Sequence, residues 1–282
     1  MGNAIEIKNL CKEYPGFALK DVSFSVPSGL CCGFVGPNGA GKTTTLKAML
    51  GMVHKSGGEI RLLGKADGDV TAKEDIGVMF DQPYFQEDWT PLDIEKGIKP
   101  FYRGWDGGQY RKYLAQFGLD PKKKFKDFSR GMKMKLSFAV HLSHGAKLLI
   151  LDEPTSGLDP VARDEMLDIM REHLVEEDRT ILFSTHITSD LERIADMIVY
   201  ISGGSISFSG DKDELVSRHC VVRGGRLPEE KRRYAIGIRE YKDGYECLME
   251  TDNIGGLPPD AVTERATIGD VVVYMERRSR YA

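Results

Sequence analysis

One eight-residue segment, Gly36-Pro-Asn-Gly-Ala-Gly41-Lys42-Thr43, restricts the fold of this chain more than any other part of the sequence. A near-continuous apolar run over residues 30–35 precedes it, and a stretch with helical apolar spacing follows it, with Leu46, Met49 and Leu50. Strand, glycine-rich turn and helix in this order match the phosphate-binding pattern G-x-x-x-x-G-K-[ST]. The glycines let successive backbone N–H groups converge on phosphate oxygens, and the helix start adds a positive dipole end. The segment therefore predicts a nucleoside triphosphate site.

Two side chains of this segment have different predicted roles at that site. The ammonium group of Lys42 can reach the β- and γ-phosphates, and the hydroxyl of Thr43 can ligate Mg²⁺. The residues that we assign to nucleotide binding here are Gly36, Pro37, Asn38, Gly39, Ala40, Gly41, Lys42, Thr43 and Thr44.

A pair of acids follows a second apolar run. Residues 147–151 predict a buried strand, and Asp152 and Glu153 come directly after it. A strand that ends in Asp places a carboxylate at the carboxyl edge of a parallel sheet, beside the phosphate segment, where Mg²⁺ would bind. Glu153 could orient or deprotonate an attacking water. We therefore expect Asp152 to be a metal ligand and Glu153 to be catalytic.

The remaining pattern indicates an α/β fold with an insert. Apolar runs at 30–35, 147–151 and 180–184 predict parallel strands, and Asp159-Pro160 begins a helix that we expect to reach about Glu177. The first thirty residues alternate with period two, which is typical of half-buried strands. Residues 84–145 are rich in helical patterns and show no convincing strand, so we expect a helical insert there.

The chain after about residue 215 differs in pattern. Two alternating runs, 236–241 and 245–250, flank Lys242-Asp243-Gly244 and predict a hairpin. Thr267 and Asp270 precede an apolar stripe and resemble a capping box of a short terminal helix. We therefore divide the chain into a domain over 1–215 and a small accessory region over 216–282.

Composition excludes several classes of function. The net charge is −4, so no overall positive field holds nucleic acid or an anionic membrane surface. No run approaches the roughly 20 apolar residues of a membrane-spanning helix, and the N-terminus lacks the pattern of a signal peptide. Five cysteines show neither paired nor metal-ligand spacing, as expected of reduced thiols. These features favour a cytosolic chain.

Four further elements decide among the classes of phosphate-binding proteins. Phe128-Ser129-Arg130-Gly131-Met132 precedes Asp152 and resembles the signature motif of ATP-binding cassette (ABC) proteins, whose commonest form is Leu-Ser-Gly-Gly-Gln. Ser156-Gly-Leu-Asp159, His186 and Tyr14 stand in the order that the same family has. The resemblance covers residues 1–215. It implies a P-loop NTPase of ABC type: a mostly parallel sheet, an antiparallel N-terminal β region, the helical insert and a small C-terminal α+β appendage.

The resemblance also implies residue roles and a dimer. Tyr14 would stack on adenine, and His186 would contact the γ-phosphate and hold Glu153 and water in place. Ser129 and Gly131 would donate to a γ-phosphate held by a second ABC subunit, and Asp159 would also belong to the nucleotide site. Lys42, Glu153 and His186 are thus the catalytic set. Because two such chains enclose two ATP head to tail in this family, the resemblance implies a homodimer or heterodimer.

Two departures from the family pattern leave questions open. Arg130 and Met132 replace the commonest Gly and Gln of the signature. The family's Gln that links Mg²⁺ to the membrane partner falls by spacing on Asp81, whereas the nearby glutamine is Gln82. We assign Gln82 to cofactor and metal binding, with Asp81 as its rival.

The resemblance predicts a motor subunit of a membrane transporter, similar to bacterial exporters, which uses ATP and Mg²⁺ and drives membrane-spanning subunits on separate chains. We expect it in the cytoplasm, on the inner face of the membrane. The alternatives are a soluble ABC-type ATPase acting on ribosomes or DNA and a weakly hydrolysing nucleotide sensor. The lysine-rich residues 122–135 favour a solvated helix face over a nucleic-acid patch. Aromatic residues of the insert are either core or a docking surface for a membrane subunit, namely Tyr84, Phe85 and Trp89.

Overall fold

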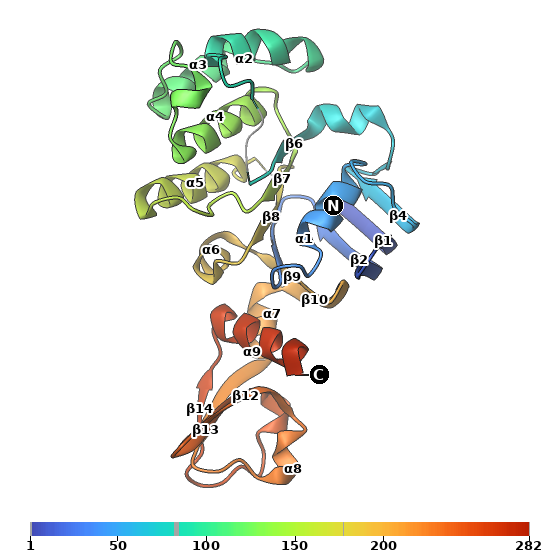
Figure 1. Cartoon of the computed structure of the whole chain (residues 1–282), viewed down its shortest axis with the longest axis vertical. Helices are drawn as coiled ribbons and strands as arrows, with labels where there is room; N and C mark the ends of the chain where they lie inside the picture. The colour runs from blue at the N-terminus through green and yellow to red at the C-terminus, as the bar shows by residue number, and fades with distance from the viewer. Residues whose placement is uncertain (1, 82–84, 177, 282) are drawn as a thin grey trace.

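A six-stranded sheet in the order β10-β9-β3-β8-β7-β6 forms the centre of the computed structural model, which describes residues 2–81, 85–176 and 178–281 and no side chain of 278–281 (Figure 1). Neighbouring strands from β9 to β6 are parallel, and β10 is antiparallel to β9. The strands are β3 (Cys31–Val35), β6 (Ile76–Met79), β7 (Leu148–Asp152), β8 (Thr180–Thr185), β9 (Met197–Ser202) and β10 (Ser205–Asp211). The three predicted parallel strands are β3, β7 and β8, and all three are entirely buried.

Alternate residues of these strands face two different cores. Cys31 and Val35 of β3 pack with the helices α4 (Arg130–Ser143), α5 (Pro160–His173) and α6 (Thr188–Ile194). Cys32 and Phe34 pack on the other side, with α1 (Lys42–Met49) and the N-terminal strands. A strand covered on both faces needs apolar residues at every position, which explains the continuous apolar runs.

The N-terminal residues form a separate antiparallel sheet, in the order β2-β1-β4-β5. Its strands are β1 (Asn3–Tyr14), β2 (Phe17–Pro27), β4 (Gly57–Leu62) and β5 (Lys65–Ala66), followed by the 3-10 helix η1 (Val70–Asp75). Ile5, Leu10 and Val22 are fully buried from solvent in the second core, which gives the strands one covered face. The expected antiparallel N-terminal region is therefore confirmed.

The described part of the insert is helical. Its elements are α2 (Pro91–Ile98), η2 (Lys99–Phe101), α3 (Gly107–Gln116), η3 (Phe125–Asp127) and α4. Thr90 and Asp93 form a capping box at the start of α2, which fixes that boundary. Phe85 packs edge-on against the buried Phe125, so this aromatic belongs to the core, and Tyr84 lies outside the described residues. Trp89 is 40% exposed.

One predicted helix boundary is wrong. The helix that begins after Asp159 ends at His173 rather than near Glu177, which lies outside the described residues. Leu174, the C-cap residue, still packs against the core, but Val175 is 80% exposed and adds no buried contact that would hold a longer helix there.

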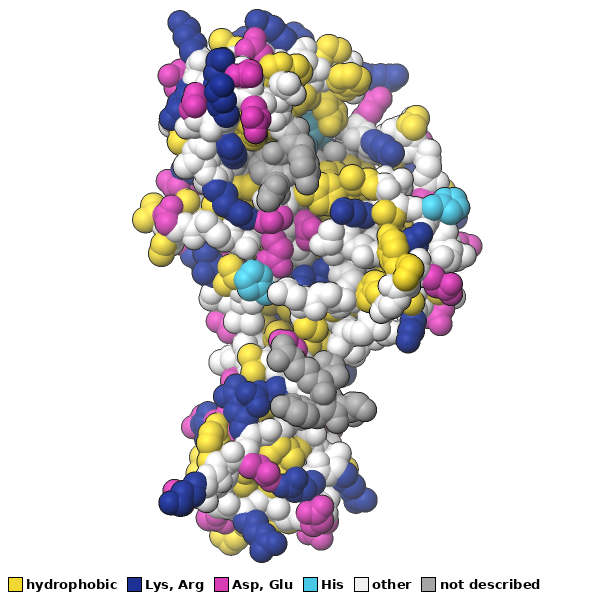
Figure 2. Space-filling model, viewed as in Figure 1, with side chains coloured by type: hydrophobic (Ala, Val, Ile, Leu, Met, Phe, Trp, Pro, Cys, Tyr) yellow, Lys and Arg dark blue, Asp and Glu magenta, His cyan; other side chains and the backbone are white. Residues whose placement is uncertain are grey.

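The residues from 216 onward form a smaller body below a narrow waist (Figures 1 and 2). After α7 (Lys212–Ser217), a sheet in the order β12-β13-β11-β14 is covered by α9 (Ile268–Tyr281). Its elements are β11 (His219–Gly224), α8 (Glu229–Arg232), β12 (Ala235–Tyr241), β13 (Gly244–Glu250), η4 (Thr251–Asn253) and β14 (Val262–Arg265). The predicted hairpin is confirmed as β12 and β13, and Thr267 and Asp270 form the predicted cap.

Helix α9 joins this region to the main body. Val271 and Tyr274 of α9 belong to the same hydrophobic core as Leu191 and Ile194 of α6.

Among the described residues, no helix combines the length and the apolar character that a membrane crossing needs.

Candidate functional site

The phosphate segment connects β3 to α1 and depends on its glycines. Gly39 and Gly41 have φ angles of +80° and +113°, in the region that favours glycine. A Cβ on Gly36 would lie 2.1 Å from the carbonyl oxygen of Ile201, so no larger residue fits there. The loop conformation therefore follows from the predicted motif itself.

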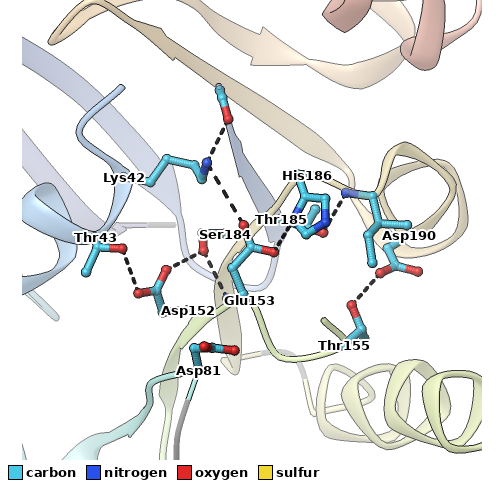
Figure 3. Close-up of polar contacts among 12 residues, drawn as sticks. Lys42, Thr43, Asp81, Asp152, Glu153, Thr155, Ser184, Thr185, His186 and Asp190 are labelled. Carbon is cyan, nitrogen blue, oxygen red and sulfur yellow. Dashed lines mark hydrogen bonds and ion pairs between the residues drawn. The ribbon is translucent and has the colours of Figure 1, made fainter. Parts of the chain in front are cut away.

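Lys42 lies at the beginning of α1 and is 7% exposed. Its Nζ donates to the carbonyl of Gly36 at 2.7 Å and lies 4.0 Å from Oε1 of Glu153 (Figure 3). Burial lowers the pKa of Lys42, and the neighbouring Glu153 and Asp152 oppose this shift. A partly desolvated ammonium group held in a loop of backbone amides is suited to bind an anion.

A cavity of about 700 Å³ opens over this loop. Figure 2 shows acidic side chains gathered in the hollow of the upper body, where the cavity lies. Its walls come from segments far apart in the sequence: Gly16, Phe17, Pro37, Asn38, Gly39, Gly41, Lys42, Thr43, Thr44, Asp81, Asp152, Glu153, Ser156 and His186. The fold thus places the predicted catalytic residues around one cavity.

Two hydroxyl groups donate hydrogen bonds to the carboxylate of Asp152, which lines this cavity. The hydroxyl of Thr43 donates to Oδ2 of Asp152 at 2.9 Å, and the hydroxyl of Ser184 donates to Oδ1 at 2.6 Å (Figure 3). Hard oxygen donors of this kind fit Mg²⁺, which takes few protein ligands and fills its shell with phosphate and water. Thr43 and Asp152 therefore fit the metal that the sequence predicts.

Glu153 is held in an unusual conformation. Its φ of +53° is left-handed, which costs a non-glycine residue about 1–2 kcal/mol. The backbone N–H of Glu153 donates to both the carbonyl and the hydroxyl oxygen of Ser184, at 3.2 and 3.0 Å. Its carboxylate contacts Nδ1 of His186 at 2.7 Å, and the His186 side chain is 57% exposed toward the cavity. Contacts between distant segments therefore hold the Glu153 carboxylate against the ring of His186.

The signature residues lie elsewhere. Ser129 caps α4 by accepting a hydrogen bond from the N–H of Met132 at 3.3 Å. Among the described residues, the cavity lining includes neither Ser129, Gly131, Asp159 nor Tyr14. Asp159 caps α5 instead, accepting from the N–H groups of Val161 and Ala162 at 3.0 Å each.

The aromatic residue beside the cavity differs from the predicted one. Tyr14, at the end of β1, is 42% exposed, and Lys12 lies 4.9 Å from its ring centroid. Phe17 at the start of β2 lines the cavity and was not singled out from the sequence. Because Gly16 has a φ of +83°, the tight turn between the strands places Phe17 at the rim.

Two of the departures from the family motifs, Asp81 and Arg130, contact each other. Asp81 lines the cavity, and the guanidinium of Arg130 forms an ion pair with its carboxylate. Arg130 also lies over Gly157, where an added Cβ would come within 3.3 Å of the guanidinium carbon. Gln82 lies outside the described residues. Asp81 is therefore the described residue of this pair of candidates, and it faces the cavity.

Several site residues had no signal in the sequence. Ser184 contacts Asp152 and Glu153, and the buried Asp190 contacts Thr155, two residues after Glu153. Ser184 lies in an apolar strand and Asp190 in an ordinary helical pattern, so only contacts across the fold identify them.

Comparisons with known proteins identify the family of this chain. The family model described as "ABC transporter" matches residues 19–156. The ABC transporter ATP-binding protein YxlF of Bacillus subtilis is 38% identical over 248 residues, which cover 86% of this chain and 79% of the relative. The lantibiotic transport ATP-binding protein SrtF of Streptococcus pyogenes is 35% identical over 231 residues, 81% of this chain and 100% of the relative.

A solved structure supports the same assignment. It is described as an ATP-binding subunit of an ABC transporter and aligns with a TM-score of 0.68 at 30% identity, over 75% of this chain and 91% of that one. The motifs, the cavity and these relatives together show the family. This chain belongs to the ABC transporter family, as an ATP-binding and ATP-hydrolysing subunit.

Proposed function

We propose that this chain is the motor subunit of a bacterial-type exporter, in which two such subunits enclose two Mg²⁺-ATP head to tail and drive separate membrane-spanning subunits. The observation that carries the proposal is the gathering of Lys42, Thr43, Asp152, Glu153 and His186 around one cavity. Glu153 would accept the proton of the attacking water, and His186 would hold that carboxylate in place. Mg²⁺, bound through Thr43 and Asp152, would offset phosphate charge.

The dimer is proposed from the position of the signature helix. Ser129 is exposed at the start of α4, outside the cavity of its own chain. A helix start with free N–H groups and a hydroxyl is a good site for a phosphate. A second chain could bring its bound γ-phosphate to this helix, and the symmetric arrangement would complete both sites.

The membrane partner is proposed from a second cavity. It measures about 480 Å³, lies near the junction of α1, the end of β6 and the insert, and is lined mainly by apolar side chains such as Leu50, Met52, Phe80 and Tyr102. Met52 is 58% exposed and the neighbouring Phe101 is 77% exposed. An apolar groove of this kind suits an amphipathic helix of another chain. Docking there would hold the subunit at the cytoplasmic face of the membrane.

The relatives support the transport role. SrtF is named for lantibiotic transport, and we extend to this chain an export function without naming its cargo. Cargo recognition is expected in the membrane-spanning subunits. We expect no nucleic-acid partner, because the lysines at 124 and 126 are paired with Asp88.

The first experiment replaces Glu153 with Gln, which keeps the shape of the side chain and removes the base. We expect ATP turnover to fall by a factor of about 100 or more, while ATP still binds and traps a dimer visible by size-exclusion chromatography. Glu172→Gln, on the exposed face of α5, is the matched control and should leave turnover unchanged. Unchanged hydrolysis by the Glu153→Gln variant would remove the proposed base.

The partner is tested separately. The Glu153→Gln variant, trapped with ATP, should co-purify with a polytopic membrane protein from detergent-solubilised membranes. Recovery with ribosomes or DNA instead would support the soluble ATPase and contradict the transport proposal.

A further inference from the structure

Asp190 is a charged residue with no exposed surface that lies close behind the catalytic residues. It belongs to α6, and its carboxylate accepts a hydrogen bond from the hydroxyl of Thr155 at 2.6 Å (Figure 3). Its other oxygen accepts from Nε of Arg163 at 2.7 Å. A buried carboxylate is costly unless it is fully paired, and both oxygens of this one have a strong donor.

These contacts join three segments that carry site residues. Thr155 is itself buried and follows Glu153 by two positions. Asp190 is four positions after His186, and Arg163 is four positions after Asp159, in α5. Arg163 also donates to the hydroxyl of Ser189 at 2.6 Å, which gives it two contacts on α6. The Glu153 turn, the His186 turn and α5 therefore meet at one carboxylate.

The geometry of Glu153 and His186 depends on these turns. His186 is largely exposed, so little packing holds its ring, and the backbone on either side has to fix it. On one side the buried Thr185 accepts a hydrogen bond from the N–H of Ile187 at 3.0 Å, and on the other Asp190 fixes α6. Glu153 has a left-handed backbone, which persists only when its surroundings hold it.

We propose that Asp190 is a positioning residue for ATP hydrolysis, which sets the distance between Glu153 and His186 by fastening the turns that carry them to each other and to α5. The inference rests on the proposed role of Glu153 as the base. Lys42 and the phosphate loop belong to other elements, so Asp190 acts on turnover and leaves ATP affinity unchanged. Because Asp159 caps the start of α5, the same carboxylate connects this pair to the segment that follows β7.

The sharpest test changes Thr155, since valine has its shape without the hydroxyl and serine retains the hydroxyl. In Thr155→Val, one oxygen of a buried charge loses its donor, and the Glu153 turn is no longer tied to α6. We expect kcat to fall by a factor of about ten or more, with the ATP dissociation constant within twofold of the wild-type value. Thr155→Ser should retain most of the turnover.

A second readout does not use activity. Hydrogen exchange of the Glu153 amide, which is bonded to Ser184, should become faster in Thr155→Val and in Asp190→Asn, without nucleotide. Asp190→Asn keeps the shape but cannot accept at both positions, so its kcat should also fall while ATP affinity is retained.

The matched control is Arg193→Ala. Arg193 also joins α6 to α5, through an ion pair with Asp164, but it does not contact the Glu153 turn. Its kcat should stay near the wild-type value even if its melting temperature falls. The inference is overturned if Thr155→Val retains wild-type kcat, or if Arg193→Ala loses as much turnover. If Glu153→Gln also keeps hydrolysing ATP, the proposed function fails as well.

Discussion

The cavity over the phosphate loop and the exposed start of α4 differ in how complete they are within one chain. Around the cavity, Thr43, Asp152, Ser184, Glu153 and His186 contact one another through short hydrogen bonds. At the start of α4, the hydroxyl of Ser129 caps its own helix and faces solvent. One chain therefore contains an assembled set of catalytic side chains, and Ser129, which we propose contacts the phosphate of a second chain, lies apart from it.

The largest expected effect comes from inactivating each half separately. Lys42→Ala removes the buried ammonium group, and Ser129→Ala removes the hydroxyl that we propose contacts the phosphate of the second chain. We expect Lys42→Ala to lower ATP turnover by about a hundredfold or more and Ser129→Ala to lower it by about tenfold or more. Turnover is measured as phosphate release, with Lys47→Ala on the same helix as a control that keeps activity.

Mixing the two variants distinguishes the arrangements. In a head-to-tail dimer of one Lys42→Ala and one Ser129→Ala chain, one site receives both intact halves. The mixture should therefore hydrolyse ATP faster than either variant alone. If the activities merely average, each chain completes its own site, and the start of α4 does not serve a second chain.

An intermediate effect is expected from Ser184→Ala, which tests whether the hydrogen bonds of Ser184 to Asp152 and Glu153 support catalysis. The change removes a hydrogen bond to the Asp152 carboxylate and one from the Glu153 amide, both in a buried environment. Loss of a bond to a charged group corresponds to about 1.5–3 kcal/mol, so we expect kcat/KM to fall by about tenfold or more. The Mg²⁺ concentration for half-maximal turnover should rise.

A buried serine outside the cavity supplies the control for this variant. Ser143 donates to the carbonyl of Ala139 in its own helix, and Ser143→Ala should leave the Mg²⁺ dependence unchanged. Equal kinetic losses in the two variants would mean that Ser184 acts only on stability.

The smallest effect is expected at the contact that joins the two regions. Arg130 of α4 offsets the negative charge of Asp81, which lines the cavity and would otherwise repel the phosphates of a bound nucleotide. Arg130→Ala should weaken ATP binding by about threefold to fivefold, and the Asp81→Asn/Arg130→Ala double variant should restore it. The effect should shrink at high salt because both side chains are partly exposed. A double variant as weak as Arg130→Ala would show that Arg130 acts independently of Asp81.

Apart from His186, which was assigned from the order of the family's motifs, the predicted residues that line the cavity belong to runs of consecutive residues. The loop at Gly36–Thr43 needs glycines for its own backbone angles, and the acids after β7 are placed by the end of a single buried strand. The predicted cap at Thr267 likewise binds a group three residues away. Such features depend on local geometry, which a sequence pattern records directly.

The unpredicted parts are pairs of side chains that are distant in the sequence. Ser184 contacts Asp152 across 32 positions, Asp190 contacts Thr155 across 35, and Arg130 contacts Asp81 across 49. A local pattern can single out one member of such a pair, such as Asp152 or Arg130, but it does not record which distant residue that member contacts. The early end of α5 and the position of Phe17 in the cavity wall depended in the same way on packing and on a turn.

The sequence by itself therefore determined that this chain binds a nucleoside triphosphate and which sheet carries the site, and it predicted the residues that would hold the phosphates. These properties follow from glycine backbone freedom, helix starts and continuous apolar strands, all of which act within a few residues. Only the tertiary structure decided that the Glu153 carboxylate contacts His186 and that the start of α4 lies outside the cavity over the phosphate loop. Those outcomes depend on strand order and helix docking, because free energy from contacts between distant segments exists only once the whole sheet is assembled.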